Sequence, residues 1–195
     1  RETNTESTRY LTKYAKESGS RFIFLSTDNV FDGARGQYVE ADVVNPVNYY
    51  GRTKVWAEHA IRESNCFYVI ARVALVVGLP LLGMGNSAMS RMLATLKEGR
   101  VLGVPDYEIR SPIDVITLGK AIIDLVTSSY QGVLHLAGND SLGRYEMMKK
   151  VAYRFGFDEN LVVRNDPRGL PGRAERPVNV SLDNTLARSI LSIPL

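Results

Sequence analysis

The sequence is poor in the residues that build disulfide frameworks and metal centres. It has one cysteine, Cys66, and two histidines, His59 and His135. A single cysteine permits no internal disulfide, and two separated histidines form no cluster at metal-ligand spacing. We therefore expect a reduced, cytoplasmic protein without a bound metal. We interpret His135, which has apolar neighbours, as a structural residue, and His59 as part of a helix surface.

Long apolar segments and basic stripes are also missing. The longest apolar stretch, residues 69–85, is interrupted by Arg72, Pro80 and several glycines, and is too short to cross a bilayer. The net charge of +3 comes from 24 basic and 21 acidic residues spread along the chain. We expect no membrane span and no nucleic-acid partner. The start at Arg1, without a signal-peptide pattern, suggests a part of something longer.

Short apolar runs alternate with amphipathic segments in the first part of the chain. Residues 21–27 and 67–77 are continuous apolar runs, which predict strands covered on both faces, as in a parallel sheet. Residues 3–18 and 49–64 show the apolar spacing of helices. This order predicts an α/β fold, namely the latter part of a doubly wound, Rossmann-like parallel sheet over residues 1–78.

After Gly78 the pattern changes to a turn-rich connector followed by shorter elements. We predict helices over 87–98, 114–128 and 144–155, strands over 101–104 and 133–137, and a loop over 164–177. These elements indicate a smaller mixed α/β substrate-binding lobe over residues 79–195. We expect the helix at 114–128 to pack back on the first domain.

Three polar residues occupy positions suited to carbonyl chemistry. Thr27 ends the first buried strand, and ligands of open α/β sheets bind beyond the carboxyl ends of strands. Tyr50 and Lys54 are four residues apart at the start of the next helix, so they share one face. A cation beside a phenol lowers the phenol pKa, and a threonine hydroxyl can donate to a reacting oxygen. We predict these three as the catalytic residues.

Spacing alone is weak evidence, because the chain contains a second match. Tyr145 and Lys149 also stand four apart. No strand-ending serine or threonine precedes them, and Tyr145 sits where a core aromatic is expected. We interpret this second pair as ordinary helix packing.

The residues around Thr27 and Tyr50 carry a family resemblance. The runs that carry it are Phe22-Ile-Phe-Leu-Ser-Thr-Asp-Asn-Val-Phe-Asp-Gly33, Tyr50-Gly-Arg-Thr-Lys54, Arg110-Ser-Pro-Ile113 and Arg176-Pro-Val-Asn-Val-Ser-Leu-Asp183. The sequence resembles extended short-chain dehydrogenases/reductases over nearly its whole length, nearest to the dTDP-4-dehydrorhamnose reductase family. The family's Gly-rich dinucleotide-binding segment does not occur in these residues, so we expect it in a missing N-terminal segment.

The resemblance implies roles for ten residues. Thr27 and Tyr50 would polarise and protonate a substrate carbonyl, and Lys54 would lower the tyrosine pKa and hold the nicotinamide ribose. The expected cofactor, NADP or NAD, would also contact Ser26, Arg72 and Val73. The expected substrate, a nucleotide-linked sugar, would contact Asp28, Asn86, Arg110 and Arg176.

Several interpretations stay open from the residues alone. Asp28 orients the site or serves as a turn residue. Arg176 is favoured as a diphosphate ligand, whereas Arg164, Arg168 and Arg173 are interpreted as a solvated loop. Asn29 stands where the family usually has an aromatic residue, which leaves the sugar open.

The implied function is an NAD(P)H-dependent reductase of a keto group on a nucleotide-linked sugar. One alternative is an NAD-dependent sugar-nucleotide epimerase or dehydratase, which uses the same pair of residues and recycles its cofactor. Another is a non-catalytic regulatory subunit of the methionine adenosyltransferase beta type. We also expect a homodimer that forms through the helices at 3–18 and 49–64.

Overall fold

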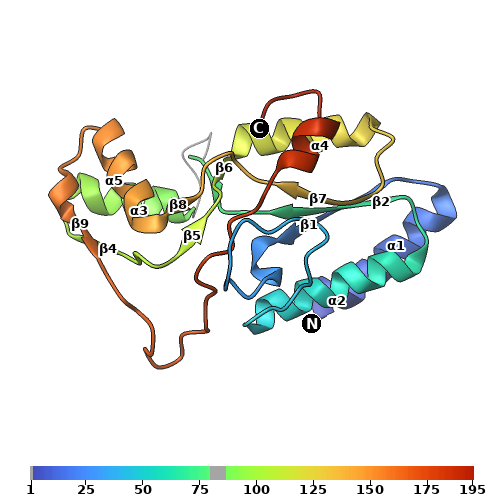
Figure 1. The fold of residues 1–195 in the computed structure, drawn as a ribbon, viewed down its shortest axis with the longest axis horizontal. Coiled ribbons are helices and arrows are strands. Elements are labelled where there is room, and N and C mark those ends of the chain that lie inside the picture. Colours follow the sequence, from blue (N-terminus) through green and yellow to red (C-terminus); the bar gives the residue numbers. More distant parts are fainter. Residues whose placement is uncertain (1, 80–86) are drawn as a thin grey trace.

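A three-stranded parallel sheet forms the centre of the larger part of the molecule (Figure 1). The computed structural model describes residues 2–79 and 87–195, without the side chains of residues 2 and 3. The strand order is β1-β2-β7, and these strands span Phe22–Thr27, Tyr68–Val73 and Gly132–Leu136. Thr27 lies beside Val73, so β1 and β2 end at the same level. The predicted parallel α/β fold is confirmed.

Helices cover both faces of this sheet (Figure 1). One face carries η1 (Glu2–Glu6), α1 (Ser7–Ser18) and α2 (Tyr49–Ser64), and the other carries α4 (Val115–Thr127) and α6 (Thr185–Ile190). The apolar side of α4 packs on the sheet through Leu118, Ala121 and Leu125. Burial of such side chains contributes about 1.5–3 kcal/mol each for the larger ones. The helix α4 therefore packs on the β1-β2-β7 sheet.

Polar caps fix the two ends of α2, the helix that carries Tyr50 and Lys54. The Asn48 side chain accepts a hydrogen bond from the Gly51 N–H (2.9 Å), and Asn65 ends the helix in the left-handed conformation, with φ of 55°. Gly51 is required by packing, because a Cβ there would lie 2.2 Å from the Asn29 carbonyl oxygen. The start of α2 is thereby held against the residues that follow β1.

The smaller lobe is built from short elements. They are β3 (Val76–Val77), α3 (Ala88–Lys97), β4 (Leu102–Val104), β5 (Ile109–Arg110), β6 (Ile113–Asp114), β8 (Leu142–Gly143), α5 (Arg144–Arg154), η3 (Glu159–Leu161) and β9 (Val162–Arg164). The strands pair two by two, β3 with β6, β4 with β9 and β5 with β8. A separate apolar cluster around Met148 holds α3, α5 and the β4-β9 pair together.

Two sequence-based expectations need correction. The strand predicted over 67–77 ends at Val73, and Val76–Val77 pairs with β6 instead of continuing in the main sheet. The main sheet takes β7 from beyond residue 79, so the chain is not divided into two consecutive halves. We keep the two lobes as a proposal in which β7, α4 and α6 belong with the first part.

The chain returns from the smaller lobe to the main sheet as a long extended segment (Figure 1). After β9 it runs through the predicted loop and reaches Tyr38, whose N–H donates to the Ser181 carbonyl oxygen (3.0 Å). The Asp183 N–H donates back to the Tyr38 carbonyl oxygen (2.8 Å). Val180 and Leu182 then pack with Phe31 in an apolar cluster. Distant parts of the sequence thus meet beyond the carboxyl end of β1.

Both histidines have the predicted surroundings. His135 on β7 is fully buried, and its Nδ1 lies 3.1 Å from the Tyr38 oxygen and 3.2 Å from the Asp183 oxygen. Burial, aided by the charge of Arg72, lowers the pKa of His135 to about 4, so the ring is neutral at pH 7. His59 is exposed on α2. Among the described residues, no helix could cross a membrane and no group of side chains could hold a metal ion.

Candidate active site

A cavity of about 240 Å³ lies at the carboxyl end of β1, where the two lobes meet. Five of the predicted site residues line it: Thr27, Asp28, Tyr50, Arg110 and Arg176. They come from β1, the turn after it, α2, β5 and the returning segment. The first catalytic prediction, that the residues at the end of β1 and the start of α2 share one cavity, is consistent with this geometry.

Thr27 lies at the centre of a hydrogen-bond network with the two residues that follow it. Its hydroxyl donates to Asp28 Oδ1 (3.1 Å) and accepts from the backbone N–H of Asn29 (3.2 Å). The second contact caps the short helix η2 (Asp28–Val30). The Asn29 side chain donates to the same carboxylate oxygen at 2.7 Å. Asn29 Nδ2 also approaches the Thr27 oxygen at 3.3 Å, so the Thr27 proton points to Asp28 and Asn29 occupies its acceptor positions.

Tyr50 also lines this cavity, and it is about half exposed. Burial raises the pKa of Tyr50 above its usual value, the Thr27 hydroxyl acts in the opposite direction, and the Asp28 charge raises the pKa further. The phenol is therefore protonated at neutral pH. Thr27 and Tyr50 line the same cavity, and the Thr27 hydroxyl is among the groups that shift the pKa of Tyr50.

Lys54, which shares a face of α2 with Tyr50, contacts the end of β1. Its Nζ donates to the carbonyl oxygen of Leu25 in β1 (2.9 Å) and lies 4.7 Å from the centre of the Phe24 ring. Desolvation lowers the pKa of Lys54 itself, while Glu58 opposes this effect. Lys54 is not among the groups that shift the pKa of Tyr50, and its ammonium group binds the backbone of β1 instead. A catalytic part for Lys54 stays a prediction.

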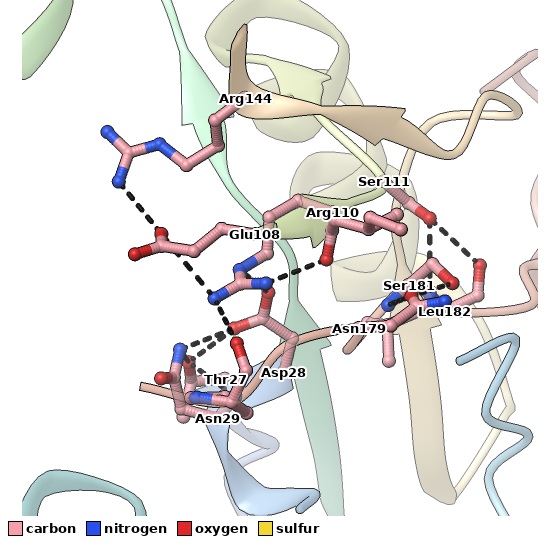
Figure 2. Close-up of polar contacts among 12 residues, drawn as sticks. Thr27, Asp28, Asn29, Glu108, Arg110, Ser111, Arg144, Asn179, Ser181 and Leu182 are labelled. Atoms are coloured by element: carbon pink, nitrogen blue, oxygen red, sulfur yellow. Dashed lines mark hydrogen bonds and ion pairs between the residues drawn. The ribbon is translucent and has the colours of Figure 1, made fainter. Parts of the chain in front are cut away.

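Asp28 and Arg110 form a buried pair beneath the cavity (Figure 2). Arg110 Nε lies 3.7 Å from Asp28 Oδ2. Desolvation raises the pKa of Asp28, and the Arg110 charge acts against it. Arg110 also donates to the carbonyl oxygens of Pro177 (3.0 Å) and Val178 (3.1 Å). Most of its donors are engaged within the protein, so Arg110 shapes the cavity wall more than it offers a free cation.

Glu108 forms ion pairs with three arginines on the same wall, and Figure 2 shows two of them, Arg110 and Arg144. Its buried carboxylate lies 2.9 Å from Arg144, 3.6 Å from Arg173 and 3.7 Å from Arg110. Glu108 Oε1 and Arg144 Nε, both buried, have no hydrogen-bond partner among the described residues. The cluster carries more positive than negative charge, which suits an anionic ligand.

Arg176 is exposed, like Arg173, and lines two cavities. It lines the cavity with Tyr50 and a second one of about 330 Å³, which Arg173 also lines. The neighbouring loop arginines have partners of their own, since Arg164 pairs with Asp106 and Arg168 with Asp166. The solvated-loop interpretation fits these two residues. Arg173 is different, because it reaches Glu108.

Ser26 and Arg72 belong to a buried network away from the cavity. Arg72 is 1% exposed and donates to both carboxylate oxygens of Glu58, at 3.1 and 2.8 Å. Ser26 donates to the same carboxylate at 2.6 Å. Val73 is buried in the core of the sheet. The structure does not bring these three side chains to this cavity, and their contacts with the rest of the chain are structural. Their predicted contacts with a cofactor stay a prediction.

One predicted site residue lies outside the described part of the chain, and several residues at the cavity were not predicted. Asn86, predicted to bind substrate, lies outside the described residues. Glu108 and Arg144 were missed, because they meet only through the pairing of β5 with β8, and these strands are too short to leave a pattern. The Arg–acid pairing of Asp28 and Arg110 also has no signal in the sequence, since 82 positions separate the two residues.

The fit to a dinucleotide is partial. The Tyr50 hydroxyl and the Lys54 ammonium group lie near the end of β1, and Lys54 has one acceptor and further N–H groups, which suits a ribose. No Gly-rich loop between a strand and a helix occurs in the sequence. These residues could hold the nicotinamide end, and the diphosphate would need other contacts.

Comparisons with known proteins agree with the fold. A family model described as "RmlD substrate binding domain" matches residues 1–195. The dTDP-4-dehydrorhamnose reductase of Aggregatibacter actinomycetemcomitans is 28% identical over 97% of this chain and 67% of its own length. Methionine adenosyltransferase 2 subunit beta from Bos taurus is 28% identical over 92% of this chain. The chain spans about half of that relative's length, 55%.

A solved structure of a relative has the same fold. The crystal structure of dTDP-4-dehydrorhamnose reductase from Bacillus anthracis in complex with NADP superimposes with a TM-score of 0.87 and 26% identity. The match covers 95% of this chain and 65% of that one. Because the family model spans the described fold and the cavity residues alike, this chain belongs to the RmlD substrate binding domain family.

Proposed function

We propose that this chain is the substrate-binding and proton-donating part of a reductase that uses NADP(H) or NAD(H) to reduce a keto group on a nucleotide-linked sugar. The observation that carries the proposal is the meeting of Thr27 and Tyr50 at a cavity walled by arginines. The hydroxyl pair suits a carbonyl, and the arginines suit the phosphates of a nucleotide. The NADP bound in the crystal structure of the Bacillus anthracis relative supports the cofactor class.

The residues of this chain would share the reaction as follows. The nicotinamide supplies the hydride when it is bound. Tyr50, whose raised pKa keeps it protonated, donates its proton to the carbonyl oxygen as that oxygen gains charge. Thr27 turns its hydroxyl proton from Asp28 towards the same oxygen, and Asp28 is left with the Asn29 amide and Arg110 as partners. Arg176 holds the anionic part of the substrate.

A direct spectrophotometric assay of cofactor oxidation tests the proposal. Full-length protein that contains this chain should oxidise NADPH or NADH when dTDP-4-dehydrorhamnose is added, and the fall in reduced-cofactor absorbance measures the rate. A control without keto-sugar should show no oxidation. If no keto-sugar supports oxidation with either cofactor, the proposal is wrong. Cofactor that stays bound through purification and is recycled would indicate an epimerase or dehydratase instead.

A second candidate is favoured by one observation, the 28% identity to the subunit named methionine adenosyltransferase 2 subunit beta. In that case the same fold would bind a larger enzyme and would carry out no reduction. The presence of threonine, tyrosine and lysine at positions 27, 50 and 54 favours the reductase. Stable co-purification with a methionine adenosyltransferase, without oxidation of NADPH by any keto-sugar, would favour the subunit.

A homodimer through α1 and α2 is part of the proposal. The outer sides of these helices expose large apolar residues, among them Tyr10 (76%), Tyr14 (72%) and Leu11 (56%). Such a patch is typical of surfaces that another protein covers. Light scattering of the full-length protein should give twice the monomer mass, and a Tyr14→Glu variant should shift the mass towards the monomer. An unshifted dimer would place the interface elsewhere.

A further inference from the structure

A short strap of the returning segment, residues 175–178, crosses from the smaller lobe to the start of α2. It carries Arg176, which lines both cavities. Pro177 is buried, whereas Arg176 is exposed. The distance between Arg176 and Tyr50 therefore depends on whatever holds this strap in place.

Two side chains hold the strap, one on each side of Arg176. Before it, Asn48 Nδ2 donates to the Glu175 carbonyl oxygen (3.1 Å). After it, Arg110 donates to the carbonyl oxygens of Pro177 and Val178, at 3.0 and 3.1 Å. The Arg110 contact is buried and is supported by Asp28, as described above. The Asn48 contact is the exposed one, so it decides how firmly the first half of the strap is fixed.

Asn48 uses both ends of its amide. Its oxygen accepts from the Gly51 N–H and caps α2, while its nitrogen donates to the strap. An amide is suited to this pair of contacts because it carries an acceptor and a donor on one rigid group. The cap lies two residues before Tyr50. One side chain thus joins the helix of the proton donor to the strap of the arginine.

We propose that Asn48 is a positioning residue, which sets Arg176 at the distance from Tyr50 that an anionic, nucleotide-linked substrate requires. The identity of the substrate rests on the proposed function. The connection from α2 through Asn48 to Glu175 rests on the geometry alone. Loss of the link leaves Tyr50 in place and frees Arg176 to move, so substrate binding weakens while the chemical step is largely kept.

Two substitutions separate the cap from the link. Asp and Ser at the first capping position both accept the hydrogen bond from the helix as well as Asn does. Asn48→Asp loses the donor to Glu175 and adds a charge. Asn48→Ser has a side chain too short to donate to the Glu175 carbonyl oxygen, and it adds no charge. Asn160→Asp, at an exposed position of η3, serves as the charge-matched control far from the strap.

The first readout needs no ligand. Trypsin cuts after Arg173 only when the following residues, 174–176, extend into the protease, so this cut reports release of the strap. In the full-length protein, mass spectrometry should show the cut after Arg173 about three-fold or more faster in both Asn48 variants than in the wild type. The cut after Arg168 and the Asn160→Asp protein should keep the wild-type rate. Melting temperatures should stay within roughly 2 °C of the wild type, because the cap is preserved.

The second readout is the split between KM and kcat. Both Asn48 variants should raise KM for the nucleotide sugar by roughly three- to ten-fold, the size expected for one hydrogen bond, and change kcat by less than about two-fold. An increase in Asn48→Asp alone would indicate charge repulsion and would overturn the inference. Unchanged cleavage after Arg173 in both variants would also overturn it. If the wild-type protein turns over no keto-sugar, the proposed function fails, and the cleavage result still decides the link.

Discussion

The Tyr50→Phe variant is expected to lose turnover of a keto-sugar by about 10²–10⁴-fold, the usual contribution of a positioned acid. Phenylalanine keeps the ring and its packing at the start of α2 and removes only the proton that the carbonyl oxygen needs. The raised pKa of Tyr50 means that this proton is present throughout the neutral range. The measurement is kcat for NADPH oxidation by the full-length protein. Cofactor affinity should change little.

The second tyrosine-lysine pair in the chain provides the matched control. Tyr145 lies in the smaller lobe, where it packs against the apolar cluster and beneath Arg164, at 4.5 Å from ring centre to guanidinium carbon. Lys149 donates to the Glu159 carbonyl oxygen. Tyr145→Phe should therefore keep near wild-type turnover. If Tyr50→Phe keeps its activity as well, Tyr50 is not the proton donor.

Replacement of Arg72 by methionine is expected to lower the free energy of unfolding by about 3–5 kcal/mol. The variant leaves the Glu58 carboxylate buried at 2% exposure, with the Ser26 hydroxyl as its main partner. A buried charge without its counter-ion is costly, because the protein interior solvates it poorly. Urea unfolding of the variant and the wild type, monitored by circular dichroism, measures the difference.

Two further variants distinguish the buried pair from general effects of charge. Arg62 lies 3.9 Å from the same Glu58 carboxylate, but its side chain is 47% exposed, so Arg62→Met should cost less than about 1 kcal/mol. The double variant Glu58→Gln with Arg72→Met removes both charges and should recover part of the loss. A loss below about 1 kcal/mol for Arg72→Met would contradict the structural role assigned to this pair.

The sequence was informative where a local signal decides the structure. The helix at 49–64 has the predicted bounds, because Asn48 supplies a cap and Asn65 a left-handed end. The two strands of the sheet were found because each is a continuous apolar run, although the second was predicted too long. The meeting of Thr27 with Tyr50 follows from the same elements, since a strand end and the next helix start adjoin in a parallel sheet.

Long-range pairing explains what the sequence did not reveal. The family resemblance implied a cofactor contact for Arg72, and the sequence held no sign that Glu58, 14 positions earlier, binds its guanidinium group in the core. Nothing in either segment marks the two as partners. Glu108 and Arg144 likewise come together through two-residue strands, which are too short for any periodicity. The arginine wall of the cavity is thus a property of the tertiary fold.

The late return of residues 180 and 182 to the cluster around Phe31 has a consequence for synthesis of the chain. Phe31 and Tyr38 leave the ribosome early, but Val180 and Leu182 follow only when most of the chain has been made. At the usual rate of translation this interval is on the order of 10 s. Throughout that time the nascent chain presents apolar rings to the cell, which makes this region a natural target for chaperones and a weak point in any product truncated before residue 180.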